Sequence, residues 1–339
     1  MHQTLLSVEN LNISFNHVSD KPLKIVDDIS FTISQEDVVG LVGESGCGKT
    51  LTALSIMKLL PSNAICSGKV LFKGENLLAL EDRKLRNIRG QEISMIFQEP
   101  MTSLNPVFTV GYQIAEALTT HKNMNKKTAL EETIRLLRDV KIPSPELRAK
   151  EYPHQMSGGM RQRIMIAMAI ACSPSLLIAD EPTTALDVTI QAQILELLGS
   201  LKEKNKMSIL LITHDLGIVA EWVQRVKVMY AGRIVEEADV REIFTNPRHP
   251  YTIGLFESLP GKKGEALTPI PGQVPKMNEL PAGCKFSPRC RYVIKECHEK
   301  EPALISVNPP VTPLIKVMTR RGGEVGFKHL SRCIRAMEI

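Results

Sequence analysis

The sequence predicts an α/β fold built on a parallel sheet, and three observations support this prediction. Apolar runs at 38–42, 176–179 and 209–213 have the composition of buried parallel strands. Glycine, carboxylate or histidine residues follow these runs, and α/β proteins place ligands at the carboxyl ends of such strands. Helical periodicity follows the first two runs. With 339 residues, 43% of them hydrophobic, the chain can form one large domain and an appendage.

Charge and hydropathy narrow the class of protein. The formal net charge of +5 is mild, so the sequence does not require nucleic acid as a partner. No apolar run approaches the length that spans a membrane. Residues 1–10 lack the charged and apolar regions of a signal peptide. We therefore expect the chain to stay in the cytoplasm, where disulfides are disfavoured.

A glycine-rich loop at 43–50 joins the first apolar run to a helix predicted over 51–60. Glycines let successive backbone N–H groups point into one concavity, which the positive end of the following helix also faces. Lys49 adds a charge for the β- and γ-phosphates of a nucleotide, and Thr50 can place its hydroxyl on Mg²⁺. A turn that binds nothing is the alternative. The expected nucleotide contacts are Gly43, Glu44, Ser45, Gly46, Cys47, Gly48, Lys49, Thr50 and Leu51.

Cys47 is a candidate reactive thiol within this loop. It lies next to Lys49 and a helix N-terminus, and both features predict a lowered thiol pKa. We therefore expect bound ATP to shield Cys47 from alkylation. A small filler residue without chemistry is the alternative.

Alternating patterns predict half-buried strands beside this core. Residues 5–15 and 29–33 alternate apolar and polar side chains, and 70–72 forms a further short strand. Phe15 ends the first of these strands. It either stacks on a purine base or belongs to the core.

A helical insertion and a second candidate phosphate site follow along the chain. Periodicity over 111–121 and 127–141 predicts two helices within the α/β domain. Ser157 is a good N-cap for the long apolar helix after it. Gly158 and Gly159 would let an outside group approach the N-terminus of that helix closely.

Polar side chains stand at the ends of the other predicted strands. Asp180 suits a Mg²⁺ ligand, and Glu181 suits a residue that polarises water. Carboxylates that cap the next helix are the alternative. Gln98 ends a strand predicted over 93–98, and His214 follows the third apolar run.

The chain resembles the ATPases of ATP-binding cassette (ABC) transporters over residues 5–240. The implied fold is an α/β P-loop NTPase cassette: a RecA-like core with an antiparallel β subdomain and an inserted helical subdomain. We expect the cassette at 1–255, its helical subdomain at about 100–157, and a small C-terminal cysteine-containing domain at 256–339. The resemblance rests on six motifs in the order of the family, namely the glycine loop, Gln98, Ser157-Gly158-Gly159, Asp180-Glu181, Asp187 and His214.

The resemblance also implies a role for each motif. The glycine loop corresponds to the Walker A loop and Asp180 to the Walker B aspartate, which implies Mg²⁺ ligation by Thr50, Gln98 and Asp180. Glu181 is the implied catalytic glutamate. The remaining implied roles are the Q-loop residue (Gln98), the switch histidine (His214), the signature motif that contacts the γ-phosphate on the other subunit of a dimer (Ser157, Gly158, Gly159), the D-loop residue (Asp187) and the adenine-stacking aromatic (Phe15).

One motif departs from the pattern of the family. The common signature is Leu-Ser-Gly-Gly-Gln, whereas this chain has Met156 and Met160 at the two ends. Met160 cannot make the amide hydrogen bond, but the serine hydroxyl, the glycine amides and the helix dipole remain. Because Glu181 and His214 are both present, we expect a site that hydrolyses ATP.

Further segments resemble the oligopeptide and dipeptide importers, a branch that includes nickel importers. The implied assembly has a second homologous ATPase subunit, two membrane permease subunits and an extracytoplasmic peptide-binding protein, with this chain on the cytoplasmic face of the membrane. The implied cargo is a dipeptide or short oligopeptide, with nickel as an alternative. The segments are QEPMTSLNP (98–106), SGGMRQR (157–163), DEPTTALDVT (180–189) and HPYTIGL (249–255).

Two other classes of protein compete with this interpretation. A soluble ABC ATPase acting on nucleic acid or ribosomes usually has two cassettes or a long coiled coil, and this sequence has one cassette and no sustained heptads. It also has no strong basic stripe. A P-loop kinase would not need the segment SGGMRQ. We therefore expect no nucleic-acid partner.

Four cysteines, Cys284, Cys290, Cys297 and Cys333, lie in the last 56 residues. Their spacing is wider than that of tight zinc knuckles, and four thiolates from a loop-rich segment also suit a [4Fe–4S] cluster. From 284 to 339 there are 11 Lys or Arg against 5 Asp or Glu, which would offset the charge of such a cluster. Members of the peptide-importer branch carry one, and the first three cysteines match that pattern.

The fourth ligand of this site is open at the level of the sequence. The gap before Cys333 is longer than the pattern of the branch, and His298 and His329 are candidate substitutes. Zinc, or four unliganded cysteines, are the alternatives to the cluster.

Overall fold

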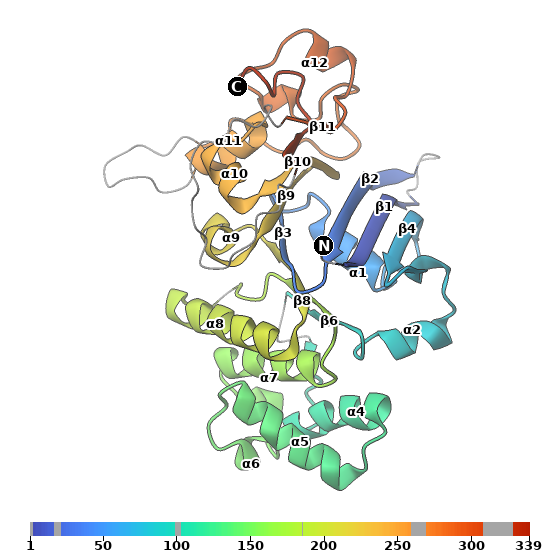
Figure 1. Cartoon of the computed structure of the whole chain (residues 1–339), viewed down its shortest axis with the longest axis vertical. Helices are drawn as coiled ribbons and strands as arrows, with labels where there is room; N and C mark the ends of the chain where they lie inside the picture. Colours follow the sequence, from blue (N-terminus) through green and yellow to red (C-terminus); the bar gives the residue numbers. More distant parts are fainter. Residues whose placement is uncertain (1–2, 17–21, 99–102, 185, 259–268, 308–327) are drawn as a thin grey trace.

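The structure is a computed structural model, and it describes residues 3–16, 22–98, 103–184, 186–258, 269–307 and 328–339. Along its long axis, a group of helices lies at one end, a large sheet runs through the middle with a smaller sheet beside it, and the C-terminal segment lies at the other end (Figure 1). None of the described helices is long and apolar enough to cross a membrane.

The large sheet is built on parallel strands: β3 (Val38–Val42), β6 (Ile93–Ile96), β7 (Leu176–Asp180), β8 (Ser208–Thr213) and β9 (Arg225–Tyr230). Their spatial order is β9-β3-β8-β7-β6. Every residue of β3, β7 and β8 is buried, which explains why these runs are apolar throughout instead of alternating. The prediction of buried parallel strands is confirmed.

The two faces of this sheet pack into two separate cores. Val38 and Val42 face one core, whereas Val39 and Leu41 face the other, because successive side chains of a strand point to opposite sides. The first core includes α7 (Gly158–Ile170), α8 (Val188–Asn205) and α9 (Leu216–Trp222), and the second includes α1 (Lys49–Ile56).

The predicted helix starts are confirmed, but one helix is shorter than predicted. The Ser157 side chain accepts a hydrogen bond from the backbone N–H of Met160 at the start of α7 (3.3 Å). Asp187 caps α8 in the same way through Ile190 (2.9 Å). The helix predicted over 51–60 ends at Ile56, because the chain turns into the left-handed region at Lys58 (φ 48°).

The smaller sheet is antiparallel, in the order β2-β1-β4-β5. Its second and third strands along the chain are longer than predicted, because their outer halves do not alternate apolar and polar side chains. Gly68 lies in this extra part of β4 at φ 105°, where a Cβ would meet the Asn10 carbonyl oxygen at 2.5 Å. The strands are β1 (Thr4–Phe15), β2 (Leu23–Ser34), β4 (Ala64–Phe72) and β5 (Glu75–Asn76), and they are followed by a 3₁₀ turn (Leu77–Ala79) and α2 (Asp82–Ile88).

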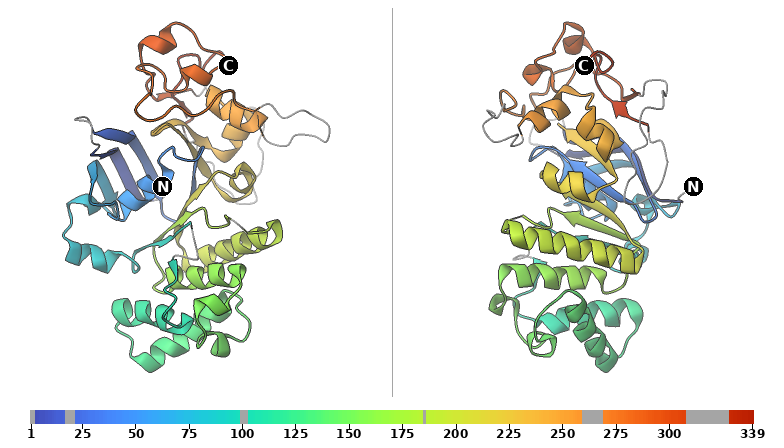
Figure 2. Two further views of the ribbon diagram at one scale, coloured as in Figure 1. Left: turned by 180° about the vertical axis from the view of Figure 1, so that it is seen from behind. Right: turned by 60° about the vertical axis from the view of Figure 1, so that its left-hand side comes forward.

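The predicted helical insertion is present between β6 and α7. It comprises α4 (Val110–Lys122), α5 (Lys126–Asp139), the short α6 (Pro145–Arg148) and a 3₁₀ turn (Pro153–Gln155). Both predicted helices are confirmed, with each boundary within two residues. Figure 2 shows α7 lying between this helical group and α8.

The C-terminal segment extends the large sheet. β10 (Arg233–Asp239) forms a hairpin with β9 through Ala231 and Gly232, both at positive φ. β12 (Leu330–Ser331) pairs with β10, and β11 (Ile305–Ser306) pairs with β12. The other elements of this segment are α10 (Val240–Thr245), α11 (Pro250–Glu257), a 3₁₀ turn (Ser287–Arg289) and α12 (Glu296–Glu299).

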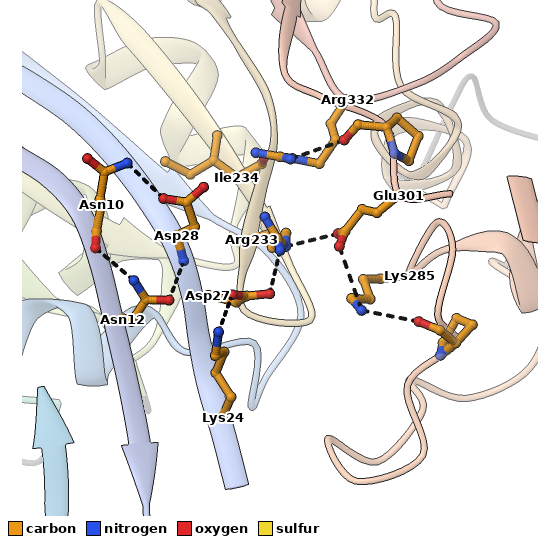
Figure 3. A network of polar contacts seen from close by, with 12 residues as sticks. Asn10, Asn12, Lys24, Asp27, Asp28, Arg233, Ile234, Lys285, Glu301 and Arg332 are labelled. Carbon is orange, nitrogen blue, oxygen red and sulfur yellow. Dashed lines mark hydrogen bonds and ion pairs between the residues drawn. The ribbon is translucent and has the colours of Figure 1, made fainter. Parts of the chain in front are cut away.

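Arg233 joins three parts of the chain at the base of this segment (Figure 3). Its guanidinium pairs with Asp27 of β2 (2.5 Å) and with Glu301 (2.9 Å). Glu301 in turn lies 3.7 Å from the Lys285 ammonium. Nearby, Arg332 donates from Nε to the Ile234 carbonyl (3.1 Å). Through Glu301 and Arg332, the part of the chain after α11 is therefore held against both β10 and the smaller sheet.

Candidate active site

The parallel strands bring the predicted site residues to one edge of the large sheet. Gly43 follows β3, Asp180 ends β7, His214 follows β8 and Gln98 lies two residues after β6. Because neighbouring parallel strands end at the same edge, these four positions from distant parts of the sequence converge.

The backbone of the glycine loop requires glycine at its first position. Gly43 has φ 151°, and a Cβ there would meet the Met229 carbonyl oxygen at 2.1 Å. The Lys49 side chain, buried over this loop, donates from Nζ to the carbonyls of Gly43 (2.7 Å) and Glu44 (3.1 Å). The ammonium therefore lies across the concavity in which phosphate groups would bind.

The prediction of a reactive Cys47 thiol is wrong for this structure. Burial raises the pKa of Cys47, and the nearby Lys49 charge lowers it by less. The side chain is only 1% exposed and packs in the core beneath the loop. Cys47 therefore fills space within the loop, as the alternative interpretation stated.

Asp180 has the environment of a metal ligand. Its side chain is 1% exposed, and its Oδ1 has no hydrogen-bond partner among the described residues. Burial raises the pKa of Asp180, whereas a hydrogen bond with Thr50 opposes this rise. A buried carboxylate oxygen without a partner, next to the Thr50 hydroxyl, suits a hard cation such as Mg²⁺.

Three side chains hold the Glu181 carboxylate. Gln98 Nε2 donates to Oε2 (3.0 Å), Thr184 Oγ1 donates to the same oxygen (2.8 Å), and His214 Nδ1 lies 3.1 Å from Oε1. Burial alone would raise the pKa of Glu181, but the hydrogen bonds with His214 and Thr184 and the nearby Lys49 charge together outweigh burial, so the pKa lies below its usual value. The carboxylate is therefore charged at neutral pH and able to accept a proton from water.

Glu181 also has an unusual backbone conformation. Its φ is 47°, in the left-handed region that residues other than glycine rarely adopt. The backbone N–H of Glu181 donates to the Ile212 carbonyl of β8 (2.8 Å), which holds this conformation. Such conformations are concentrated at functional sites.

The remaining predicted contacts lie apart from the glycine loop. Ser157, Gly158 and Asp187 are exposed, and among the described residues no hydrogen bond or ion pair joins them to residues 43–50. Phe15 is half-buried and packs against the core of the smaller sheet. This contact matches the core interpretation of Phe15, while its role in adenine stacking stays a prediction.

The four C-terminal cysteines line one cavity together with Phe286 and Tyr292. Burial raises the pKa of Cys284 to about 11 and that of Cys333 to about 12. Within the described residues, no three or more side chains of His, Cys, Asp or Glu form a group that could hold a metal ion. His329 is not in this cavity, because its Nε2 pairs with the buried Glu236 (2.6 Å).

Two contacts to the glycine loop come from residues that the sequence analysis did not single out. The backbone N–H of Glu44 donates to the hydroxyl of Tyr251 (2.8 Å). The Glu44 carboxylate pairs with Arg289. Tyr251 belongs to the HPYTIGL segment, so its motif was a usable signal, whereas nothing in the sequence links Arg289 to a loop 245 residues away. Thr184, the third residue that contacts Glu181, belongs to the DEPTTALDVT segment.

Two family models match this chain. One is described as ABC transporter and matches residues 26–184. The other is described as oligopeptide/dipeptide transporter, C-terminal region, and matches residues 235–297.

Curated relatives match almost the full length. The probable peptide ABC transporter ATP-binding protein y4tR of Sinorhizobium fredii is 52% identical over 310 residues, which cover 90% of this chain and 92% of that protein. The dipeptide transport ATP-binding protein DppD of Haemophilus influenzae is 52% identical over 329 residues, covering 96% and 99%. DppD of Escherichia coli is 51% identical over 303 residues, covering 88% and 92%.

Solved structures share the fold of the cassette. A dimeric structure of the ATP-binding cassette MJ0796, bound to ADP and Pi, has a TM-score of 0.62 and 24% identity, covering 70% of this chain and 99% of that one. The structure of cbiO1 from Clostridium perfringens has a TM-score of 0.60 and 26% identity, covering 72% and 92%.

The fold and the matched relatives define an ATPase of the ABC type, which confirms the predicted cassette fold. More narrowly, the chain belongs to the family of ABC transporter ATP-binding proteins whose relatives are named as peptide and dipeptide transport proteins.

Proposed function

We propose that this chain binds and hydrolyses ATP to power the import of dipeptides or short oligopeptides through a membrane ABC transporter. The observation that carries the proposal is the Glu181 carboxylate, which Gln98, Thr184 and His214 hold beside the buried Asp180. Relatives named for peptide and dipeptide transport support the cargo class. A nickel importer of the same branch is the alternative.

The nucleotide contacts follow from the loop geometry. The backbone N–H groups of residues 43–50 and the start of α1 would cradle the phosphates, with Lys49 supplying charge. Phe15 would stack on the base. Thr50 and Asp180 would ligate Mg²⁺, with Gln98 nearby, and the ion would neutralise charge on the β- and γ-phosphates.

Glu181 is the proposed general base. Among the described residues, two donors contact Oε2 and His214 alone contacts Oε1, so Oε1 is the oxygen we assign to accept a proton from an attacking water. His214 orients the carboxylate, and Gln98 links it to the strand end of β6. This arrangement fixes the acceptor atom before water binds, which is how a positioned base gains its rate advantage.

The second half of the site is proposed to come from another chain. Ser157 and Gly158 are exposed and Gly159 is half-buried at the start of α7, where backbone N–H groups and the helix dipole favour an anion. We propose that they contact the γ-phosphate on a second homologous ATPase subunit, with Asp187 at the same interface. The assembly would include two membrane permease subunits and an extracytoplasmic peptide-binding protein, with this chain on the cytoplasmic face of the membrane.

The proposed domain boundary separates the cassette from its C-terminal extension. Residues 1–255 would form the cassette, with a helical subdomain at about 100–157, and residues 256–339 would form the cysteine-containing part. The structure ties the two closely, since β11 and β12 extend the same sheet.

A transport assay tests this function. The chain is co-purified with its membrane subunits, reconstituted into vesicles, and assayed for ATP-dependent uptake of a labelled dipeptide in the presence of the binding protein. We expect uptake that competing dipeptides abolish and Ni²⁺ leaves unchanged. Uptake of Ni²⁺ instead would select the alternative cargo, and copurification with ribosomes rather than membrane subunits would overturn the proposal.

We further propose that Cys284, Cys290, Cys297 and Cys333 bind a [4Fe–4S] cluster. All four line one cavity, and the other three cysteines all contribute to the raised pKa of Cys333, which places them close together. Four cysteine thiolates are the donor set of a [4Fe–4S] cluster, in which each thiolate binds a different iron. The donor set therefore fits the group.

The cluster would be structural, because it lies outside the nucleotide site. We expect anaerobically purified protein to be coloured and to contain iron and sulfide in equal amounts, close to four of each per chain. Cys290→Ser should lose both, while Cys66→Ser, a cysteine of the smaller sheet, should keep both. A colourless chain, or one with a single zinc, would contradict this proposal without affecting the ATPase assignment.

A further inference from the structure

The Arg289 side chain reaches from the C-terminal segment to the glycine loop. It is 4% exposed, and its two terminal nitrogens donate to the two oxygens of the Glu44 carboxylate, at 2.7 Å and 3.0 Å. The remaining Nε donates to the Pro271 carbonyl (3.0 Å). In this bidentate pair the Arg289 side chain is buried and the Glu44 side chain is 30% exposed, and the paired geometry fixes the orientation of the carboxylate as well as its charge.

Glu44 is held at three points, and two of them come from beyond residue 249. Its backbone N–H donates to Tyr251, its carbonyl accepts from Lys49, and its carboxylate pairs with Arg289. Tyr251 is fully buried against Phe286, which precedes the turn that carries Arg289. The C-terminal segment therefore contacts Glu44, the second residue of the phosphate-binding loop, through both its backbone and its side chain.

The negative charge of Glu44 is unfavourable in a loop that binds phosphate, because it repels the ligand. Its carboxylate is close enough to the loop interior to contribute to the raised pKa of Cys47. A bound triphosphate would add several negative charges to the same concavity, so an uncompensated carboxylate would repel it. The Arg289 guanidinium compensates that charge without entering the concavity.

We propose that Arg289 is a positioning residue for nucleotide binding: by neutralising and orienting Glu44, it lets the C-terminal segment set the ATP affinity of the cassette. This inference rests on the proposed ATP site at residues 43–50. It means that residues after the cassette motifs contribute to ATP binding.

Equilibrium binding of a fluorescent ATP analogue with Mg²⁺ to the full-length protein tests the proposal. Arg289→Ala should weaken binding by about tenfold, the order expected for one unit charge acting across a partly solvated site. This loss of affinity should be smaller at high salt, because screening weakens the repulsion between the Glu44 carboxylate and the phosphates. Arg289→Lys keeps the positive charge but cannot form the bidentate pair, so its nucleotide affinity should lie between those of the wild type and Arg289→Ala.

A double variant distinguishes two roles of Arg289: neutralising the Glu44 charge and holding the C-terminal segment in place. Adding Glu44→Gln to Arg289→Ala removes the uncompensated carboxylate, and the double variant should bind the nucleotide more tightly than Arg289→Ala does. The matched control is Arg291→Ala, which breaks a bidentate pair with Glu257 two residues further along the same segment. It should leave binding unchanged.

Three outcomes would overturn the proposal. Arg289→Ala could bind as tightly as the wild type, or the double variant could bind no better than Arg289→Ala, which would make Arg289 an anchor only. If the wild type itself bound no nucleotide, the proposed ATP site would fail, and this inference with it. Thermal melting of each variant identifies any loss of binding that comes from unfolding.

Discussion

Glu181→Gln is expected to lower ATP turnover by about 10²–10⁴-fold, the usual contribution of a general base. The amide keeps the shape of the side chain but cannot take a proton from water. Binding of MgATP should persist, because the glycine loop, Lys49 and Asp180 are unchanged. ATP should then hold two ATPase subunits together, since the proposed signature contacts form but hydrolysis does not release them.

Steady-state ATPase of the assembled transporter and size-exclusion chromatography with MgATP measure these two effects. The control is Glu196→Gln, the same change at an exposed position of α8, which should leave both measurements at wild-type values. Near-normal turnover of Glu181→Gln would remove Glu181 from the catalytic role. Loss of nucleotide binding would show instead that the carboxylate has a structural role in the loop after β7.

Local sequence patterns were sufficient to predict most of the fold and the edge of the large sheet at which the candidate site lies. The apolar runs, the Ser157 cap and the loop at 43–50 each depend on neighbours within a few residues, so the sequence reports them directly. The convergence of Asp180 and His214 followed from one general property of parallel sheets.

Properties that depend on burial or on distant contacts were beyond the sequence. The position of Cys47 beside Lys49 suggested a lowered pKa, but the packing of the loop on the core raises it. The pair of Arg289 with Glu44 joins residues from opposite ends of the chain, and no periodicity marks it. Likewise β11 and β12 are two residues long, too short for a strand pattern.

One buried carboxylate, Glu236 of β10, connects several parts of the C-terminal segment. This side chain is fully buried and accepts hydrogen bonds from the backbone N–H groups of Arg248 (2.6 Å) and His249 (3.0 Å). The Nε2 of His329, just before β12, lies 2.6 Å from Oε1. One carboxylate therefore joins β10, the start of α11 and the end of the chain.

Glu236→Ala is expected to destabilise this region by about 3–5 kcal/mol, the usual cost of removing one partner of a buried charged network. Both backbone N–H groups and the imidazole would lose their acceptor, and the alanine side chain is too small to fill the space of the glutamate. The loss should appear as local opening, because the parallel strands keep their own core. Hydrogen–deuterium exchange should therefore rise at residues 248–252 and 329–332, while exchange in β3 and β7 stays slow.

The matched control for this experiment is Glu338→Ala, which removes an exposed carboxylate paired with Arg335 in the same segment. Exposed pairs contribute about 0–1 kcal/mol, so its exchange pattern should match that of the wild type. Unchanged protection at residues 329–332 in Glu236→Ala would show that β12 is held by its pairing with β10 and by Arg332 rather than by the buried carboxylate. Because the same segment carries Arg289, opening it should also weaken binding of the fluorescent ATP analogue, which links the stability of the C-terminal segment to the phosphate-binding loop.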